Sequence, residues 1–252
     1  MIEIFLLSLI QGITEFLPVS SSSHLIIFSS YSSFENQSLS IDVSLHIGSF
    51  LAVLIYFRKD IINLIKNKNL LFKIITASIP VMLVGFILVQ TNLIEKIRNI
   101  EIIGWTTLIF GVLLYVSDKC KLVKNIENNF SYKSAIIIGL FQVMSLIPGV
   151  SRSGISITAA RFLNFNRVDS AKLSFLLSIP TLGAVSIYGL KNLVISQDDY
   201  FSVLNLISIL LSFIFSLFTI NFFLKYVKNF SLDIFVIYRV LLGGFLILIA
   251  YL

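Results

Sequence analysis

The sequence predicts an all-α polytopic membrane protein with six transmembrane helices and two re-entrant helical hairpins, arranged as an inverted-topology repeat. Hydrophobic residues make up 57% of its 252 residues and charged residues 13%, and the mean hydropathy is +0.96. A soluble domain does not need so much apolar surface, so residues 1–252 are predicted to form a single integral membrane domain. The net charge of +6 does not indicate nucleic-acid binding, because the Lys and Arg residues lie in short loops between apolar runs.

Six apolar runs are candidates for full spans of the hydrocarbon core, which takes about 20 helical residues, although the first of them is short. They cover residues 41–57, 74–93, 102–116, 170–188, 200–224 and 234–252. Two further segments, 1–28 and 135–162, are each cut by a proline, Pro18 or Pro148, that small polar residues follow. Proline ends or kinks a helix, and broken backbone at membrane depth is tolerated only inside protein or beside a wet cavity. Each segment is therefore predicted to form a re-entrant hairpin, with a kinked full span as the alternative.

The distribution of basic residues predicts how these segments are oriented in the membrane. Loops rich in Lys and Arg face the cytoplasm, and here they are 58–73, 119–133, 161–172 and 225–228. The acidic or balanced loops, which are predicted to lie outside, are 35–42, 95–101 and 198–199. The hairpins then enter from opposite sides, and residues 1–117 and 134–252 form two repeats of inverted topology, as in many transporters. The two hairpin tips are predicted to meet near the membrane midplane.

The first hairpin contains a polar motif that runs from Gln11 to His24 with the sequence QGITEFLPVSSSSH. Gln11 and Glu15 are four residues apart and therefore share one face of a helix. Their oxygen atoms are of the type that Mg²⁺ and Ca²⁺ prefer, so the pair is a candidate metal site. The alternative for Gln11 is a buried polar contact with another helix. A carboxylate at membrane depth marks a functional site by default, which makes Glu15 a candidate catalytic residue.

The serines after Pro18 are candidates for phosphate binding and for nucleophilic attack. Ser20 or Ser21 is placed to cap a new helix, whose free N–H groups bind anions. In that helix Ser21 and His24 are three residues apart, a spacing that lets an imidazole reach a hydroxyl and activate it. Ser20 and Ser22 are assigned to the substrate phosphate. The alternative for the serine run is capping together with close packing of small residues.

The second hairpin contains the motif PGVSRSG at residues 148–154, which again breaks one helix and starts another. Arg152 has a planar donor fork that matches phosphate oxygens. The hydroxyls assigned to the same phosphate belong to Ser151, Ser153 and Ser156. An ion pair with Glu15 is the alternative for Arg152, and the two roles are compatible in an enzyme without substrate.

These motifs resemble those of the BacA-type undecaprenyl-diphosphate phosphatases, integral membrane enzymes associated with bacitracin resistance. The family pattern has [E/Q]-x-x-x-E before a Pro-Val-Ser-Ser run that ends in His, here from Gln11 to His24, and P-G-x-S-R-S-x-x-T, here from Pro148 to Ser156. Length, number of spans and motif positions also fit, so the resemblance covers essentially the whole chain. Three positions depart from the pattern. Ser156 replaces Thr but keeps the hydroxyl, Ser23 replaces a common Gly, and Gln11 is the weaker metal ligand of the two permitted residues.

The resemblance implies hydrolysis of undecaprenyl diphosphate to undecaprenyl phosphate and inorganic phosphate. This reaction recycles the lipid carrier for peptidoglycan synthesis and confers bacitracin resistance. The resemblance also implies a location in the bacterial plasma membrane, a site open to the outer side, and activity supported by a divalent metal, Mg²⁺ or Ca²⁺. The expected partners are the polyprenyl diphosphate lipid and the bilayer, without nucleic acid, and a homodimer stays open.

The mechanistic hypothesis gives four residues a catalytic role. Arg152 and helix N-terminal amides hold the terminal phosphate, while Glu15, with Gln11, positions the metal. Ser21 attacks phosphorus, and His24 acts as general base and then as general acid. In a rival scheme, His24 or Glu15 activates water directly.

Transport of undecaprenyl phosphate across the bilayer is the alternative function, because inverted repeats with midplane sites are typical of transporters. The serine–histidine spacing favours the enzyme, since binding alone needs no proton shuttle. A membrane scaffold is disfavoured because it leaves the Glu, His and Arg at membrane depth without a role.

Overall fold

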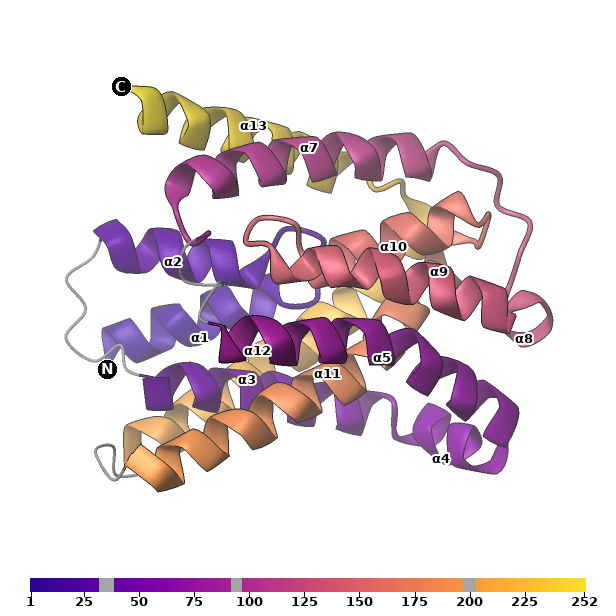
Figure 1. Ribbon diagram of the computed structural model, residues 1–252, viewed down its shortest axis with the longest axis horizontal. Coiled ribbons are helices and arrows are strands. Elements are labelled where there is room, and N and C mark those ends of the chain that lie inside the picture. Colours follow the sequence, from indigo (N-terminus) through magenta and orange to yellow (C-terminus); the bar gives the residue numbers. More distant parts are fainter. Residues whose placement is uncertain (32–38, 92–96, 197–202) are drawn as a thin grey trace.

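The chain folds into helices, most of which run along the long axis of the molecule (Figure 1). The computed structural model describes residues 1–31, 39–91, 97–196 and 203–252. The helices are α1 (Ile2–Thr14), α2 (Ser21–Tyr31), α3 (Leu39–Tyr56), α4 (Arg58–Lys66), α5 (Lys68–Gln90), α7 (Ile100–Asp118), α8 (Ile126–Asn129), α9 (Tyr132–Val143), the 3₁₀ turn η1 (Met144–Leu146), α10 (Arg152–Phe162), α11 (Arg167–Ser196), α12 (Val203–Asn229) and α13 (Asp233–Tyr251).

Six helices of this described part are long and apolar enough to cross a membrane, namely α3, α5, α7, α11, α12 and α13. The prediction of an all-α, multi-pass membrane protein with six spans is confirmed. α5 begins at Lys68 and α11 at Arg167, earlier than predicted, because these helices continue past the apolar run into charged residues. The end of the predicted span 74–93 and the start of 200–224 lie outside the described residues.

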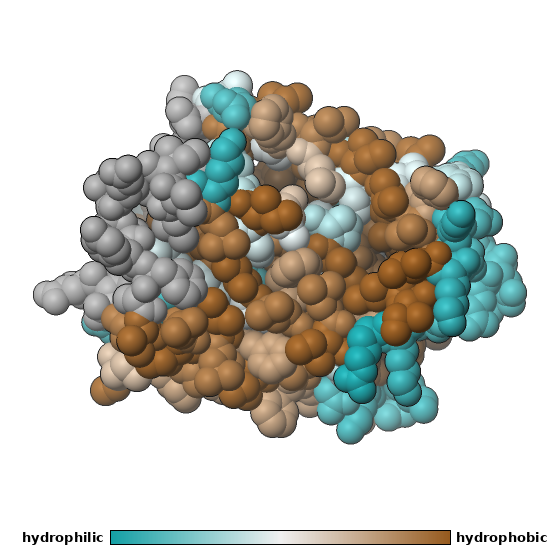
Figure 2. All heavy atoms as spheres, turned by 90° about the horizontal axis from the view of Figure 1, so that it is seen from below, coloured by the Kyte–Doolittle hydropathy of each residue, from teal (hydrophilic) through white to brown (hydrophobic). Residues whose placement is uncertain are grey.

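The surface is apolar around the middle of the molecule and hydrophilic at one end. Figure 2 shows a broad hydrophobic belt beside a group of hydrophilic side chains, at the end where α4 and α8 lie in Figure 1. Large apolar side chains in the spans are well exposed, for example Phe86 at 62%, Ile187 at 72% and Phe218 at 71%. A soluble protein does not expose an apolar area of this extent, so we assign the belt to lipid contact.

Two short helical hairpins enter the bundle from opposite ends. α1 and α2 pack against each other, as do α9 and α10, and the turns that join each pair lie near the centre of the molecule (Figure 1). With 13 and 11 residues, α1 and α10 are about 20 and 16 Å long at about 1.5 Å per residue. That is roughly half to two thirds of a hydrocarbon core of about 30 Å. The re-entrant placement of the hairpins in a bilayer stays a prediction that these lengths support.

The packing partners correspond between the two halves of the chain. α1 packs on α12 and α9 packs on α5, while α3 pairs with α11 and α7 with α13. Glycines allow the close approach of each hairpin. A Cβ on Gly12 would lie 2.5 Å from Phe215 Cβ of α12, and one on Gly139 would lie 2.5 Å from the Ala77 carbonyl oxygen of α5. These pairings are the ones that inverted repeats over 1–117 and 134–252 require, and the division itself stays a prediction.

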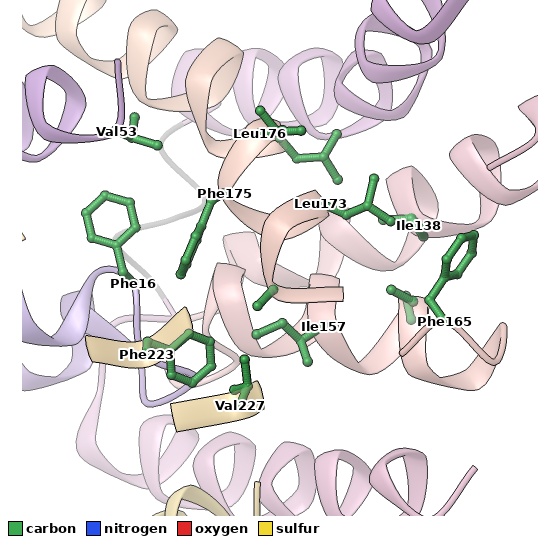
Figure 3. Close-up of a cluster of buried hydrophobic side chains, with 14 of the residues drawn as sticks. Phe16, Val53, Ile138, Ile157, Phe165, Leu173, Phe175, Leu176, Phe223 and Val227 are labelled. Atoms are coloured by element: carbon green, nitrogen blue, oxygen red, sulfur yellow. The ribbon is translucent and has the colours of Figure 1, made fainter. Parts of the chain in front are cut away.

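An aromatic cluster fixes the tip of the first hairpin. Phe16, which follows Glu15, packs edge-on against Phe175 of α11 with 5.4 Å between ring centroids, a favourable aromatic geometry. Phe57 and Phe223 also contact the Phe175 ring, at 6.0 and 5.9 Å. Figure 3 shows Phe16 and Phe223 beside Phe175 in the buried core. The backbone that carries Glu15 is therefore anchored to two spans, α11 and α12.

Candidate active site

Glu15 is the centre of a hydrogen-bonded cluster between the two hairpin tips. It lies at the C-terminal end of α1 and is 7% exposed. Its Oε1 accepts from Arg152 Nη2 at 2.8 Å, although 137 residues separate the two in sequence. Its Oε2 accepts from Ser21 Oγ at 2.7 Å and from Gln11 Nε2 at 3.0 Å. The structure thus brings together four of the predicted site residues, and the ion pair between Glu15 and Arg152 is formed.

Arg152 occupies the first position of α10, directly after the tip of the second hairpin. Ser151 caps this helix, because its Oγ accepts from the Gly154 amide at 3.1 Å. The second guanidinium nitrogen, Nη1, lies 3.4 Å from the Ser174 carbonyl oxygen of α11. The Arg152 side chain keeps 13% of its surface exposed. A ligand can therefore reach the guanidinium from its exposed side.

His24 has a different partner from the one predicted. Its Nδ1 lies 2.6 Å from the Ser20 carbonyl oxygen, and its Nε2 lies 2.5 Å from the Tyr238 hydroxyl of α13. Ser21 meanwhile directs its hydroxyl to Glu15. The spacing of three residues does put Ser21 and His24 on neighbouring positions of α2, but the imidazole turns back to the carbonyl one turn earlier. The carboxylate of Glu15, rather than His24, accepts the hydrogen bond of the Ser21 hydroxyl.

The predicted phosphate-binding serines divide into two kinds. Ser20 and Ser151 both precede a helix and both have positive φ, 78° and 72°. Such backbone is uncommon for residues other than glycine and is often found at functional sites. Ser20 Oγ bonds the Ser23 hydroxyl at 2.9 Å and lies 3.4 Å from that of Ser22, which is exposed. Ser20 and Ser22 therefore line the start of α2, whereas the Ser151 hydroxyl caps the start of α10.

Ser153 and Ser156, also assigned to phosphate, are both buried. Ser153 Oγ donates to the Leu17 carbonyl oxygen at 2.6 Å and so joins the second hairpin to the tip of the first. The Ser156 hydroxyl has no hydrogen-bond partner in the described part of the chain. Ser153 therefore holds the two tips together, while Ser156 retains an unused donor inside α10.

Arg239 of α13 binds both tips and was not singled out by the sequence reasoning. Its side chain has no exposed surface. Nη1 donates to the carbonyl oxygens of Pro18 at 3.2 Å and Val150 at 3.0 Å, and Nη2 donates to that of Gly149 at 2.9 Å. Nε donates to the Thr107 carbonyl oxygen of α7 at 3.2 Å. One guanidinium thus sets the position of the first tip relative to the second.

Comparison with known proteins identifies the family. A family model described as "Bacitracin resistance protein BacA" matches residues 4–245. The chain belongs to the BacA family. This confirms the resemblance seen in the two motifs, and the match extends over the spans as well as the hairpins.

Curated proteins named undecaprenyl-diphosphatase are similar to this BacA-family chain over almost its full length. The one from Pelagibacter ubique (strain HTCC1062) is 51% identical over 251 residues, which cover 99% of this chain and 98% of that protein. Those from Jannaschia sp. (strain CCS1) and Ruegeria sp. (strain TM1040) are 39% and 38% identical. Their alignments cover 98% and 100% of this chain, and 98% and 99% of the relatives.

The predicted metal ligands of this BacA-family chain lie side by side. Gln11 Oε1 is a buried oxygen without a hydrogen-bond partner among the described residues, while its amide nitrogen bonds Glu15. No group of three or more His, Cys, Asp or Glu side chains suited to a metal occurs in that part of the chain. An ion such as Mg²⁺, which takes few protein ligands and completes its shell with water and phosphate oxygens, fits this pair of residues better than a metal that needs a full protein cage.

Two residues of the BacA-family site, Tyr238 and Arg239, come from the last span. The sequence could have indicated Arg239, because a lone arginine inside the apolar run 234–252 is costly unless it has a function or partners. Nothing in the sequence distinguished Tyr238, since tyrosine is common in membrane helices near the interface. Local spacing within the two motifs does not reach these residues.

Proposed function

We propose that this chain hydrolyses undecaprenyl diphosphate to undecaprenyl phosphate and inorganic phosphate, and so recycles the lipid carrier for peptidoglycan synthesis and confers bacitracin resistance. The substrate is supported by the relatives, which are named undecaprenyl-diphosphatase. The observation that carries the proposal is the Glu15 carboxylate, which accepts from the Ser21 hydroxyl on one oxygen and from Arg152 on the other. A nucleophile, a proton acceptor and an anion-binding group therefore lie within one hydrogen-bonded cluster.

The hairpin tips provide a binding site for a diphosphate. α2 and α10 both begin at the tips, so the amide ends of two helices lie near the centre of the molecule (Figure 1). Helix N-termini attract anions through free N–H groups and the helix dipole. The Arg152 guanidinium adds a fixed positive charge and a fork of donors. The prenyl tail would extend from this site into the surrounding lipid, which the apolar belt contacts.

The geometry supports a two-step transfer with Glu15 as the proton acceptor. Binding of the terminal phosphate draws Arg152 from Glu15 and leaves the carboxylate free. Ser21 Oγ then bonds to the terminal phosphorus while the bond to the bridging oxygen breaks, and the serine proton passes through Glu15 to the departing undecaprenyl phosphate. Water next attacks the phosphoserine, and its proton passes through Glu15 to the Ser21 oxygen as inorganic phosphate leaves.

A divalent metal, Mg²⁺ or Ca²⁺, belongs to the proposal as well. Gln11 Oε1 and the Glu15 carboxylate would hold it, and its chemistry is to offset the negative charge of the diphosphate. Gln11 then serves as a ligand through its Oε1, which has no hydrogen-bond partner among the described residues.

The site is proposed to open to the outer side of the bacterial plasma membrane. The hydrophilic end of the molecule in Figure 2 includes α4 and the loop before α8 in Figure 1, and both are rich in Lys and Arg. By the positive-inside rule that end lies in the cytoplasm. The first hairpin, with Glu15 and Ser21, then enters from the opposite, outer side.

Release of inorganic phosphate from undecaprenyl diphosphate by the detergent-purified protein tests this function. We expect release in the presence of Mg²⁺ or Ca²⁺ that Arg152→Ala reduces at least about a hundredfold, as expected for loss of a group that binds the transferred phosphate. A detergent micelle has no second compartment, so transport alone gives no release. Folded wild-type protein that releases no phosphate with either metal would overturn the proposal in favour of a transporter.

A further inference from the structure

His24 is held by one residue from each half of the chain. Its Nδ1 lies 2.6 Å from the Ser20 carbonyl oxygen, and a carbonyl only accepts, so Nδ1 carries the proton. The neutral ring then has its lone pair on Nε2, which accepts from the Tyr238 hydroxyl at 2.5 Å. The two rings are nearly parallel, at 11°, with 5.7 Å between centroids. Together the two contacts define both the tautomer and the orientation of the imidazole.

Tyr238 is itself fixed relative to the hairpin tips. The next residue of α13, Arg239, donates to carbonyl oxygens of both tips and of α7. α13 also packs along the length of α7. Tyr238 keeps 42% of its surface exposed, so the pair that it forms with His24 lies at the surface of the molecule rather than inside the core.

We propose that Tyr238 is a positioning residue for the hydrolysis: its hydroxyl holds the His24 imidazole with Nε2 turned towards α13, and His24 in turn holds the start of α2, and with it Ser21, through its bond to the Ser20 carbonyl oxygen. This inference rests on the proposed function and adds a residue from outside both sequence motifs. The hydroxyl matters more than the ring, because the stacked ring is retained in phenylalanine while the hydrogen bond to Nε2 is lost. Without that bond the imidazole is held only from Ser20.

The activity test uses the purified full-length chain and phosphate release from undecaprenyl diphosphate. Tyr238→Phe is expected to lower kcat about tenfold, the effect of losing one hydrogen bond of about 1.4 kcal/mol, and to change KM less than threefold. In a His24→Gln background the same substitution is expected to have no further effect, because Tyr238 acts through His24. The matched control is Tyr251→Phe, on the same helix, whose hydroxyl bonds Glu101 instead. It is expected to retain wild-type turnover.

The second readout does not depend on activity. The chain has only two histidines, His24 and His46, so nitrogen NMR of ¹⁵N-histidine protein, assigned with His24→Gln, reports the His24 tautomer directly. At about pH 8, where an ordinary imidazole is neutral, wild type is expected to show the Nδ1–H form with a hydrogen-bonded Nε2. Tyr238→Phe is expected to keep this tautomer, because the Ser20 carbonyl oxygen remains, but to shift the Nε2 resonance through loss of its hydrogen bond.

An unchanged His24 spectrum in Tyr238→Phe would overturn the proposal, and so would an equal loss of turnover in the His24→Gln background. Wild-type protein without phosphate release would instead contradict the proposed function, while the NMR result would still decide the role of Tyr238.

Discussion

Replacement of Arg239 by methionine is the sharpest test of how the two hairpins are held together. The guanidinium is fully buried and donates to four carbonyl oxygens, which belong to Pro18, Val150, Gly149 and Thr107. Three of these four carbonyls are in the hairpin tips. Methionine fills much of the same volume but donates no hydrogen bond, so the tips lose the only side chain that bonds the backbone of both tips in the described structure.

The expected magnitudes separate an effect on stability from an effect on the site. Each buried carbonyl left without its donor destabilises the fold by about 1–3 kcal/mol. Removal of a buried charge stabilises it by several kcal/mol, because that charge no longer has to be desolvated. These effects oppose each other, so we expect the free energy of unfolding to fall by only about 1–3 kcal/mol. A misplacement of the reacting groups by about 1 Å can cost roughly a hundredfold in rate. The loss of kcat/KM is therefore expected to reach about a hundredfold.

Arg161→Met is the matched control. Arg161 also has no exposed surface, and it donates to the carbonyl oxygens of Asp118, Cys120, Lys121 and Phe165 as well as to the Asp118 carboxylate. It lies nine residues beyond Arg152 on α10, about 14 Å along the helix axis. We expect Arg161→Met to lose at least as much stability as Arg239→Met but to keep turnover per folded molecule within about threefold.

The assay combines thermal unfolding in detergent with phosphate release measured well below the unfolding temperature of each variant. We expect a folded but nearly inactive Arg239→Met protein and a less stable but active Arg161→Met protein. Turnover of Arg239→Met within threefold of wild type would refute the alignment role of Arg239. An equal loss of turnover in both variants would show that general destabilisation explains the effect.

Three further predictions follow from the tips, the metal and the orientation. Gly149→Ala should lower the unfolding temperature clearly and the free energy of unfolding by about 2 kcal/mol or more. Gly149 has φ +94°, and an added Cβ would lie 1.9 Å from Thr106 Oγ1. An unchanged unfolding temperature would contradict this geometry of the second tip. Gln11→Ala should raise the Mg²⁺ concentration needed for half-maximal phosphate release at least about threefold, and an unchanged metal titration would remove Gln11 from the metal site. The lone cysteine Cys120, partly exposed beside α7, should resist a membrane-impermeant thiol reagent in intact cells and react after the membrane is opened; labelling in intact cells would reverse the proposed orientation.

Much of the fold could be predicted because the bilayer imposes strong local constraints. Apolar runs of the right length become spans, and Pro18 and Pro148 mark the two places where a helix must end before it crosses. The ends of the helices could be predicted less closely. α5 and α11 continue into charged residues such as Lys68 and Arg167, which lie outside the apolar runs. Hydropathy reports where the hydrocarbon ends, whereas helices end where their backbone is capped or broken.

Most of the site residues could be predicted from the sequence, but only some of their contacts. Helical spacing correctly placed Gln11 beside Glu15, yet it suggested a Ser21–His24 contact, and the structure directs the Ser21 hydroxyl to Glu15 instead. The choice among partners depends on how α1 meets α2 and α13, which no periodicity within one segment contains. Tyr238 reaches His24 across 214 residues of sequence for the same reason.

The turnover of Ser21→Ala tests whether Ser21 attacks phosphorus from its hydrogen bond to Glu15. Phosphate release from undecaprenyl diphosphate would be compared with that of Ser78→Ala, which removes a buried hydroxyl bonded only to its own helix at 2.9 Å. We expect Ser21→Ala to lose roughly a thousandfold or more in kcat, as for removal of a nucleophile, and Ser78→Ala to stay near wild type. Near-full turnover of folded Ser21→Ala would contradict the covalent route and leave direct attack by water activated at Glu15 or His24.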